Sequence, residues 1–185
     1  MDRRIGKTKK LLKKTLTTLM EEKELRKITV KEITERANIN RGTFYLHYQD
    51  IYDMVEKLGD EIITKVMKII DKSNPIGMNF LFLPVLIKII EYFYEDNKFI
   101  SALISSNGDP NFITKITNIM IEYTMETYKK EFVGHSENYI KVVTTFVVSG
   151  GIGVFTDWFK DGCKIPINEV IGPCEVIIAK GMNSI

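Results

Sequence analysis

Apolar residues recur at helical spacing along most of the chain, whereas alternation of apolar and polar residues persists for no more than four or five positions. The stretch 51–69 is typical, because its apolar positions follow one another at steps of three or four residues. These positions are Ile51, Val55, Leu58, Ile62, Val66 and Ile69. The pattern predicts an all-α protein with about nine helices.

Capping residues and helix breakers divide this pattern into separate helices. The expected helices span about 4–23, 30–37, 41–48, 51–72, 81–94, 99–105, 110–132, 137–160 and 168–180. The segment 73–77, SNPIG, is the clearest break in the chain. Gly172 and Pro173 should kink or delay the last helix.

The two shortest expected helices form a recognisable unit. Thr29 is a good N-cap with Glu32 three residues later, which predicts a capping box at the start of the first short helix. Asn38 tolerates the left-handed conformation that ends a helix, and Asn40 is a cap residue for a helix that begins at Arg41. Two short helices joined by such a turn predict a helix-turn-helix.

The N-terminal and C-terminal parts of the chain carry net charges of opposite sign, although the whole protein has a formal net charge of only +2. Residues 1–48 carry a net charge of +7, and residues 49–185 carry −5. The basic part is either a module that approaches a polyanion or a solvated basic face. A basic helix on an anionic membrane is disfavoured, because the apolar face of the first helix has no Trp or Phe anchor.

Several other classes of protein are disfavoured. The longest uncharged stretches, 73–87 and 142–156, have 15 residues each, fewer than the roughly 18 of a membrane span. The N-terminus does not have the pattern of a secretory signal, so we expect a cytoplasmic protein without membrane association.

The composition also provides no recognisable catalytic or metal-binding pattern. Cys163 and Cys174 lie eleven residues apart and far from His47 and His135, so zinc-type spacing is absent from the sequence. The chain has no Walker loop, dinucleotide fingerprint or nucleophile elbow. We therefore predict no catalytic residues, no metal and no cofactor, and an enzyme is the least favoured class. A redox role for the two cysteines stays open.

The segment 28–50, ITVKEITERANINRGTFYLHYQD, resembles the DNA-binding module of the TetR family of transcriptional regulators (TetR/AcrR type). The matching residues are Thr29, Val30, Ala37, Ile39, Arg41, Gly42, Thr43, Phe44, Tyr45, His47 and Tyr48. The resemblance implies a helix-turn-helix DNA-binding domain at 1–48 and a helical regulatory and dimerisation domain at 49–185.

The same resemblance implies a DNA-contacting role for a set of residues in this module. They are Thr29, Lys31, Asn40, Arg41, Gly42, Thr43, Tyr45, His47 and Tyr48. Thr43, Tyr45 and His47 are expected chiefly at phosphates, and Asn40 and Arg41 at base edges or adjacent phosphates. Purely structural roles remain as alternatives: Thr29 as an N-cap, His47 as a hydrogen-bonding group within the module, and Tyr45 packed on the following helix.

One position departs from the family pattern. Many members place a lysine at the start of the helix after the module, where it meets a phosphate, and this chain has Ile51 there. Gln49 or the basic residues of the first helix are candidates to replace that contact.

The larger part of the chain is rich in aromatic and methionine residues, and the resemblance implies a small-molecule effector pocket among them. The candidate lining residues are Phe93, Met120, Tyr123, Phe155 and Trp158. At helical spacing such residues are more often core than ligand contacts. The glycine-rich segment 149–153 favours close approach of another helix, with a hinge or a ligand contact as the alternative.

These observations lead to a functional prediction. The protein is expected to be a homodimer, formed through its last two helices, that binds a double-stranded DNA operator. Its most favoured role is a repressor released by a small-molecule effector. The alternative is a regulator of the same type that acts as an activator, or through a protein partner without an effector pocket of its own.

Overall fold

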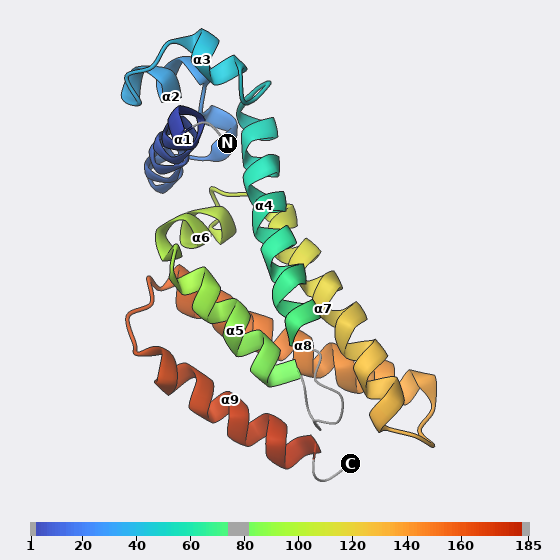
Figure 1. Ribbon diagram of the computed structural model, residues 1–185. Coiled ribbons are helices and arrows are strands. Elements are labelled where there is room, and N and C mark those ends of the chain that lie inside the picture. Colours follow the sequence, from blue (N-terminus) through green and yellow to red (C-terminus); the bar gives the residue numbers. More distant parts are fainter. Residues whose placement is uncertain (1–2, 74–81, 183–185) are drawn as a thin grey trace. The chain divides into compact units, whose positions relative to one another are not determined.

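A computed structural model describes residues 3–73 and 82–182, and every regular element in these ranges is a helix. The helices are α1 (Arg3–Glu22), the 3-10 helix η1 (Leu25–Lys27), α2 (Val30–Arg36), α3 (Arg41–Tyr45), α4 (Ile51–Lys72), α5 (Phe82–Tyr94), α6 (Asn97–Ile104), α7 (Pro110–Glu131), α8 (Glu137–Lys160) and α9 (Ile167–Met182) (Figure 1). The predicted all-α class is therefore confirmed.

The helix bounds differ from the sequence prediction in several places. The 3-10 helix η1 was not expected, α3 ends at Tyr45 rather than at 48, and α6 begins at Asn97 rather than at about 99. Helix α9 begins at Ile167 and continues through Pro173, so the expected delay is wrong. A proline removes one backbone hydrogen bond from a helix, and here that loss does not end α9. Most of the predicted break at 73–77 lies outside the described residues.

Local capping explains why α2 and α3 start where they do. The Thr29 hydroxyl accepts a hydrogen bond from the Glu32 backbone N–H at 3.2 Å, and the Asn40 side chain accepts one from Gly42 N–H at 2.8 Å. Asn38 has the expected left-handed conformation, with a φ of 50°. Glu32 differs from a full capping box, because its carboxylate pairs with the Lys23 amine at 2.6 Å.

The chain forms two compact units. Unit 1 comprises residues 1–64 and 98–112, and unit 2 comprises residues 65–97 and 113–185. Unit 1 is therefore built from two separate stretches of sequence. The functional boundary at residue 48 stays a prediction.

In unit 1, helix α2 packs against both α1 and α3 (Figure 1). The core of this three-helix arrangement is nearly inaccessible to solvent, with every member at most 2% exposed. Its large side chains are Leu12, Leu16, Leu19, Ile33, Phe44 and Tyr48. Burial of these groups fixes the orientation of α3 on the other two helices.

The segment 98–112 is attached to unit 1 by polar contacts with α1 and η1. The Asn107 carbonyl accepts a hydrogen bond from Leu25 N–H at 2.8 Å, and the Asn107 side-chain amide donates one to the Met20 carbonyl at 3.2 Å. The Lys13 amine also lies 4.3 Å from the centroid of the Phe99 ring, within the range of a cation–π interaction. These contacts make α6 and the turn after it part of unit 1.

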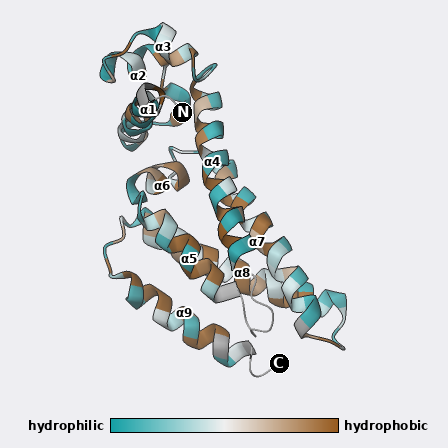
Figure 2. Ribbon diagram, viewed as in Figure 1, coloured by the Kyte–Doolittle hydropathy of each residue, from teal (hydrophilic) through white to brown (hydrophobic). Residues whose placement is uncertain are grey.

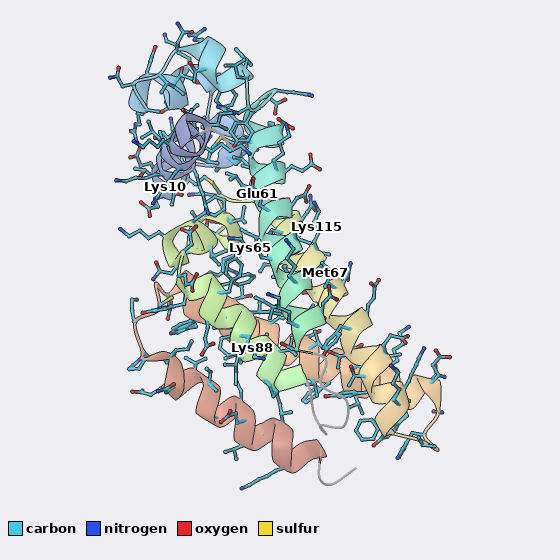
Figure 3. All side chains as sticks on the ribbon, viewed as in Figure 1. Lys10, Glu61, Lys65, Met67, Lys88 and Lys115 are labelled. Atoms are coloured by element: carbon cyan, nitrogen blue, oxygen red, sulfur yellow. The ribbon has the colours of Figure 1, made fainter. Side chains whose placement is uncertain are left out.

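Unit 2 is organised around α5, α8 and α9, which pack against one another. Helix α5 is largely hydrophobic along its length (Figure 2). The Trp158 ring of α8 stacks on Tyr94 at 5.6 Å, and its indole N–H donates to the Ile165 carbonyl at 2.9 Å. The Lys88 amine of α5 donates to the Ser73 hydroxyl at 3.2 Å (Lys88 is labelled in Figure 3). Through Trp158, the C-terminal end of α8 contacts the last residue of α5 and the loop that precedes α9.

Helix α8 has one unexpected property. By length and composition alone it could cross a membrane, and 39% of its most hydropathic window is buried inside the protein. Core helices pass the same test, so this observation is weak support for a membrane span. Several apolar side chains of α8 are exposed, among them Val142, Phe146 and Val154.

Candidate nucleic-acid interface

The turn of the helix-turn-helix is fixed by backbone contacts. The Ile39 N–H donates to the Thr34 carbonyl at 3.0 Å, and Asn38 between α2 and α3 has a left-handed backbone conformation. Ala37, the C-cap of α2, is 5% exposed. The sequence therefore produces the predicted helix-turn-helix geometry from local interactions.

Helix α3 presents two different faces. Phe44 and Tyr48 point into the core at 0% and 2% exposure, and their ring centroids are 5.7 Å apart. Tyr45 is 57% exposed and Leu46 is 81% exposed. A short helix with one buried and one free side is suited to enter a DNA groove.

Most of the predicted DNA-contacting residues lie at the surface of this module. The exposed members are Thr29, Lys31, Asn40, Arg41, Gly42 and Tyr45, and the half-buried members are Thr43 and His47. Thr29 and Asn40 also use their side-chain oxygens as helix caps. The Tyr48 side chain belongs to the core, so its hydroxyl does not lie on the outward face of α3.

Burial raises the pKa of the Tyr48 phenol to about 12, with Glu61 and Asp53 adding smaller electrostatic contributions. The hydroxyl has no hydrogen-bond partner among the described residues. The folded protein therefore keeps Tyr48 neutral at a pH where the unfolded chain, with a tyrosine pKa of about 10, is ionised.

The raised pKa predicts a loss of stability at alkaline pH. The Tyr48 contribution should be complete below pH 10 and should fall between pH 10 and about 12, by at most about 2 to 3 kcal/mol. Urea unfolding of the wild type and of Tyr48→Phe at pH 9 and pH 11 measures this difference. Equal losses in both proteins would assign the pH dependence to other groups.

Ion pairs neutralise a large part of the positive charge of the module. Arg36 forms a bidentate ion pair with Glu22, in which both N–O distances are 2.7 Å. This contact lowers the pKa of the Glu22 carboxyl. Glu24 pairs with both Arg26 and Lys27. Further pairs join Lys23 to Glu32 and Lys9 to Glu61 (Glu61 is labelled in Figure 3).

The cations outside these ion pairs form a smaller set that is available to bind phosphates. Among the described residues of the module, Lys7, Lys10, Lys14 and Arg41 are exposed and have no ion-pair partner (Lys10 is labelled in Figure 3). Lys31 is exposed and has only a long contact to Glu35 at 3.9 Å. The positive charge available for DNA therefore lies on α1 and at the start of α3.

The first residue of α4 is buried. Ile51 is 4% exposed and packs inward, so it offers no phosphate contact. Lys57, further along α4, pairs with Asp53 at 2.9 Å and donates to the His47 carbonyl at 3.3 Å. The bond from Lys57 holds the pKa of the Asp53 carboxyl below its usual range, as does the bond that this carboxyl accepts from Gln49 N–H.

Unit 2 carries an apolar groove between α8 and α9, with a volume of about 400 Å³. It is lined by Val142, Val143, Phe146, Val147, Gly150, Gly151, Val154, Cys174, Ile177, Ile178 and Gly181. Phe146 is 76% exposed, and no atom lies within 4 Å of the position that a Cβ of Gly150 would occupy. Gly150 therefore faces the open space of the groove.

The candidate effector-pocket residues are largely packed inside unit 2. Phe93, Met120, Phe155 and Trp158 are at most 8% exposed, and Tyr123 is half-buried. Phe155 and Trp158 are in ring contact at 6.5 Å. Trp158 also lines a second cavity of about 390 Å³ near the end of α8. Their role in binding an effector stays a prediction.

Sequence reasoning missed two features of this chain. Leu46 lies on the outward face of α3, and the helical spacing from Phe44 and Tyr48 was sufficient to place it there. The hydrogen bond between Asn107 and Met20 joins residues 87 positions apart, and no local sequence pattern predicts such a contact.

A basic helix-turn-helix on a helical body is the arrangement of a DNA-binding transcriptional regulator. Residues 14–58 match the family model for bacterial regulatory proteins of the tetR family. Residues 82–180, more than half of the chain, match the model for the transcriptional regulator C-terminal region. The chain belongs to the TetR family of transcriptional regulators, whose members bind DNA operators and act as dimers.

Individual relatives are distant. The chain is 33% identical over 51 residues to YxbF of Bacillus subtilis (strain 168), an uncharacterised HTH-type transcriptional regulator; the match covers 28% of this chain and 13% of that protein. The fatty acid degradation regulator FadR from Bacillus halodurans has a similar structure, with a TM-score of 0.68, 16% identity and coverage of 96% and 95% of the two chains. The dihydroxyacetone kinase operon activator DhaS has a TM-score of 0.61, 16% identity and coverage of 96% of both chains.

Proposed function

We propose that this TetR-family regulator is a homodimeric repressor that binds a DNA operator through α3 and is released by a small-molecule effector. The observation that carries the DNA-binding part is the free face of α3, with Arg41 and Tyr45 exposed in the same module as the exposed lysines of α1. Cations without ion-pair partners among the described residues can replace the counterions of DNA, which is the main source of affinity for the duplex.

The proposed role of each residue in DNA binding follows from its position in the module. Arg41, exposed at the first turn of α3, reads base edges or an adjacent phosphate. Lys7, Lys10 and Lys14 on α1 hold the sugar-phosphate backbone irrespective of sequence. Gly42, which carries no side chain, leaves space for close approach of the DNA.

The groove between α8 and α9 supports dimerisation through these two helices. Exposed apolar side chains such as Phe146, Val142 and Ile177 are costly in water, and a second copy of the same face would cover them. Two copies related by a twofold axis place two α3 helices on half-sites about 34 Å apart, one turn of the duplex.

Effector release requires a ligand whose affinity differs between two states of the dimer. The aromatic cluster around Phe93, Phe155 and Trp158 supports an apolar or weakly polar effector. Helix α4 runs without interruption from residue 51 in unit 1 to residue 72 in unit 2. A ligand that favours a different position of α4 would change the separation of the two α3 helices and weaken operator binding.

An activator is the second candidate. A protein of similar fold is a dihydroxyacetone kinase operon activator, so this fold is compatible with activation. The two roles require the same DNA contacts and differ in where the operator lies relative to the promoter. A reporter gene placed behind the native upstream region, with and without the regulator, distinguishes them by the sign of the change.

The first test is a binding titration against a duplex that covers the promoter of the protein's own gene. A scrambled duplex of equal length is the control, and each titration is made at two salt concentrations. We expect tighter binding to the promoter, a stoichiometry of two subunits and a steep fall in affinity with salt. Absence of salt-dependent binding to either duplex would favour regulation through a protein partner.

Arg41→Ala should weaken operator binding by about tenfold or more and reduce the discrimination against scrambled DNA. Lys10→Ala should weaken binding to both duplexes and lower the salt slope by about 1 for each phosphate that is no longer neutralised. Arg36→Ala is the matched control, because Glu22 already holds this arginine. An equal loss on both duplexes for Arg41→Ala would contradict the base-reading role.

A further inference from the structure

Leu46 is an unusual residue for the surface of a basic module. Its side chain is 81% exposed at the C-terminal end of α3, although a leucine gains free energy when it leaves water. The residue still has helical backbone geometry, with φ of −69° and ψ of −18°, and its N–H donates to the Gly42 carbonyl at 3.1 Å. Its direction is therefore set by the helix and not by a free loop.

Helix geometry places Leu46 opposite the core. Successive residues of a helix are rotated by about 100°, and Leu46 keeps helical backbone geometry, so its side chain is about 200° from that of Phe44. Phe44 and Tyr48 are both buried. Gly42, four residues earlier on the same side, has no side chain. Leu46, the C-cap of α3, is consequently directed away from the core and into solvent.

The chemistry of the major groove identifies a partner for such a side chain. Leucine has no hydrogen-bonding group, so it cannot hold a phosphate or read a polar base edge. The 5-methyl group of thymine is the apolar group that a base presents in this groove. The neighbouring Arg41 and Tyr45 are exposed and supply the polar contacts that hold a duplex in place.

We propose that Leu46 is a specificity-determining residue that contacts the 5-methyl group of a thymine in each half-site. This inference rests on the DNA-binding function proposed above, with α3 in the major groove. Recognition of one methyl group corresponds to about a fourfold difference in affinity for each subunit, and to about 15-fold for a symmetric dimer.

The test begins with selection of tightly bound duplexes from a random pool by the wild-type protein. Each thymine of the selected site is then replaced by uracil, which removes only the methyl group. In the wild type, one symmetric pair of replacements should weaken binding about 15-fold. In Leu46→Ala, the thymine and uracil duplexes should bind equally, while the salt slope stays that of the wild type.

Leu11→Ala is the matched control, because Leu11 is an exposed leucine of α1 in the same unit. It should keep the full difference between thymine and uracil. Both substitutions are at the surface, and unchanged thermal unfolding would exclude a folding defect.

Three results would overturn the inference. The first is a selected site without a thymine whose methyl group matters to the wild type. The second is an undiminished uracil effect in Leu46→Ala, which would assign methyl recognition to another residue. The third is a pool from which no duplex is enriched, and this result alone would also refute the proposed DNA-binding function.

Discussion

Phe146→Asp is expected to convert the proposed dimer into monomers at concentrations where the wild type is fully associated. Phe146 is 76% exposed in the groove between α8 and α9, and a twofold interface contains it twice. Burial of one phenylalanine contributes about 1.5 to 3 kcal/mol. Loss of two, with two carboxylates in their place, should raise the dissociation constant of the dimer at least about 100-fold.

Sedimentation velocity over a range of concentrations measures this change directly. Val133→Asp is the matched control, since Val133 is 84% exposed in the turn between α7 and α8 and does not line the groove. The Phe146 variant should also bind the operator at least about 100-fold more weakly, because two linked half-site contacts become independent. An unchanged dimer would show that another surface joins the subunits.

Gly108→Ala is expected to have the largest effect on stability. Gly108 lies in the turn between α6 and α7, where its N–H donates to the Ser105 carbonyl at 3.0 Å. An alanine Cβ at this position would overlap the backbone carbonyls of Ala102 and Leu103. Backbone atoms of a helix cannot move aside cheaply, so the free energy of unfolding should fall by about 2 to 4 kcal/mol.

Urea unfolding provides the measurement, and Gly6→Ala is the control. Gly6 is exposed in α1, and nothing lies within 4 Å of the position of an added Cβ. Alanine is a better helix former than glycine, so this control should gain about 0.5 to 1 kcal/mol. A Gly108→Ala protein within about 0.5 kcal/mol of the wild type would show that the turn rearranges without cost.

Local chemistry explains how much of the fold was predictable. Thr29, Asn38 and Asn40 define the helix-turn-helix through contacts within a few residues, and all three were placed correctly from the sequence. The partner of Glu32 was not predictable, because Lys23 and the Thr29 N–H compete for one carboxylate and only the folded distances decide. The same holds for the pairing of Arg36 with Glu22 across two helices.

The candidate sites show the same limit. Exposure of Arg41 and Tyr45 follows from their spacing to Phe44 and Tyr48, so the outward face of α3 was predictable. A pocket in unit 2 was not, because core residues and ligand contacts share the same helical spacing. Trp158 illustrates this ambiguity, since it stacks on Tyr94 and also lines a cavity.

Unit 1 contains residues 98–112 in addition to residues 1–64. This affects how the DNA-binding part could be transferred into a hybrid regulator. A graft that transfers only the N-terminal stretch onto another body would leave Leu25 N–H and the Met20 carbonyl without the Asn107 partner that they have here. A graft that also carries 98–112 keeps both hydrogen bonds. Unit 1 is therefore a pair of segments, and recombination at one crossover point can move both only together with residues 65–97, which belong to unit 2.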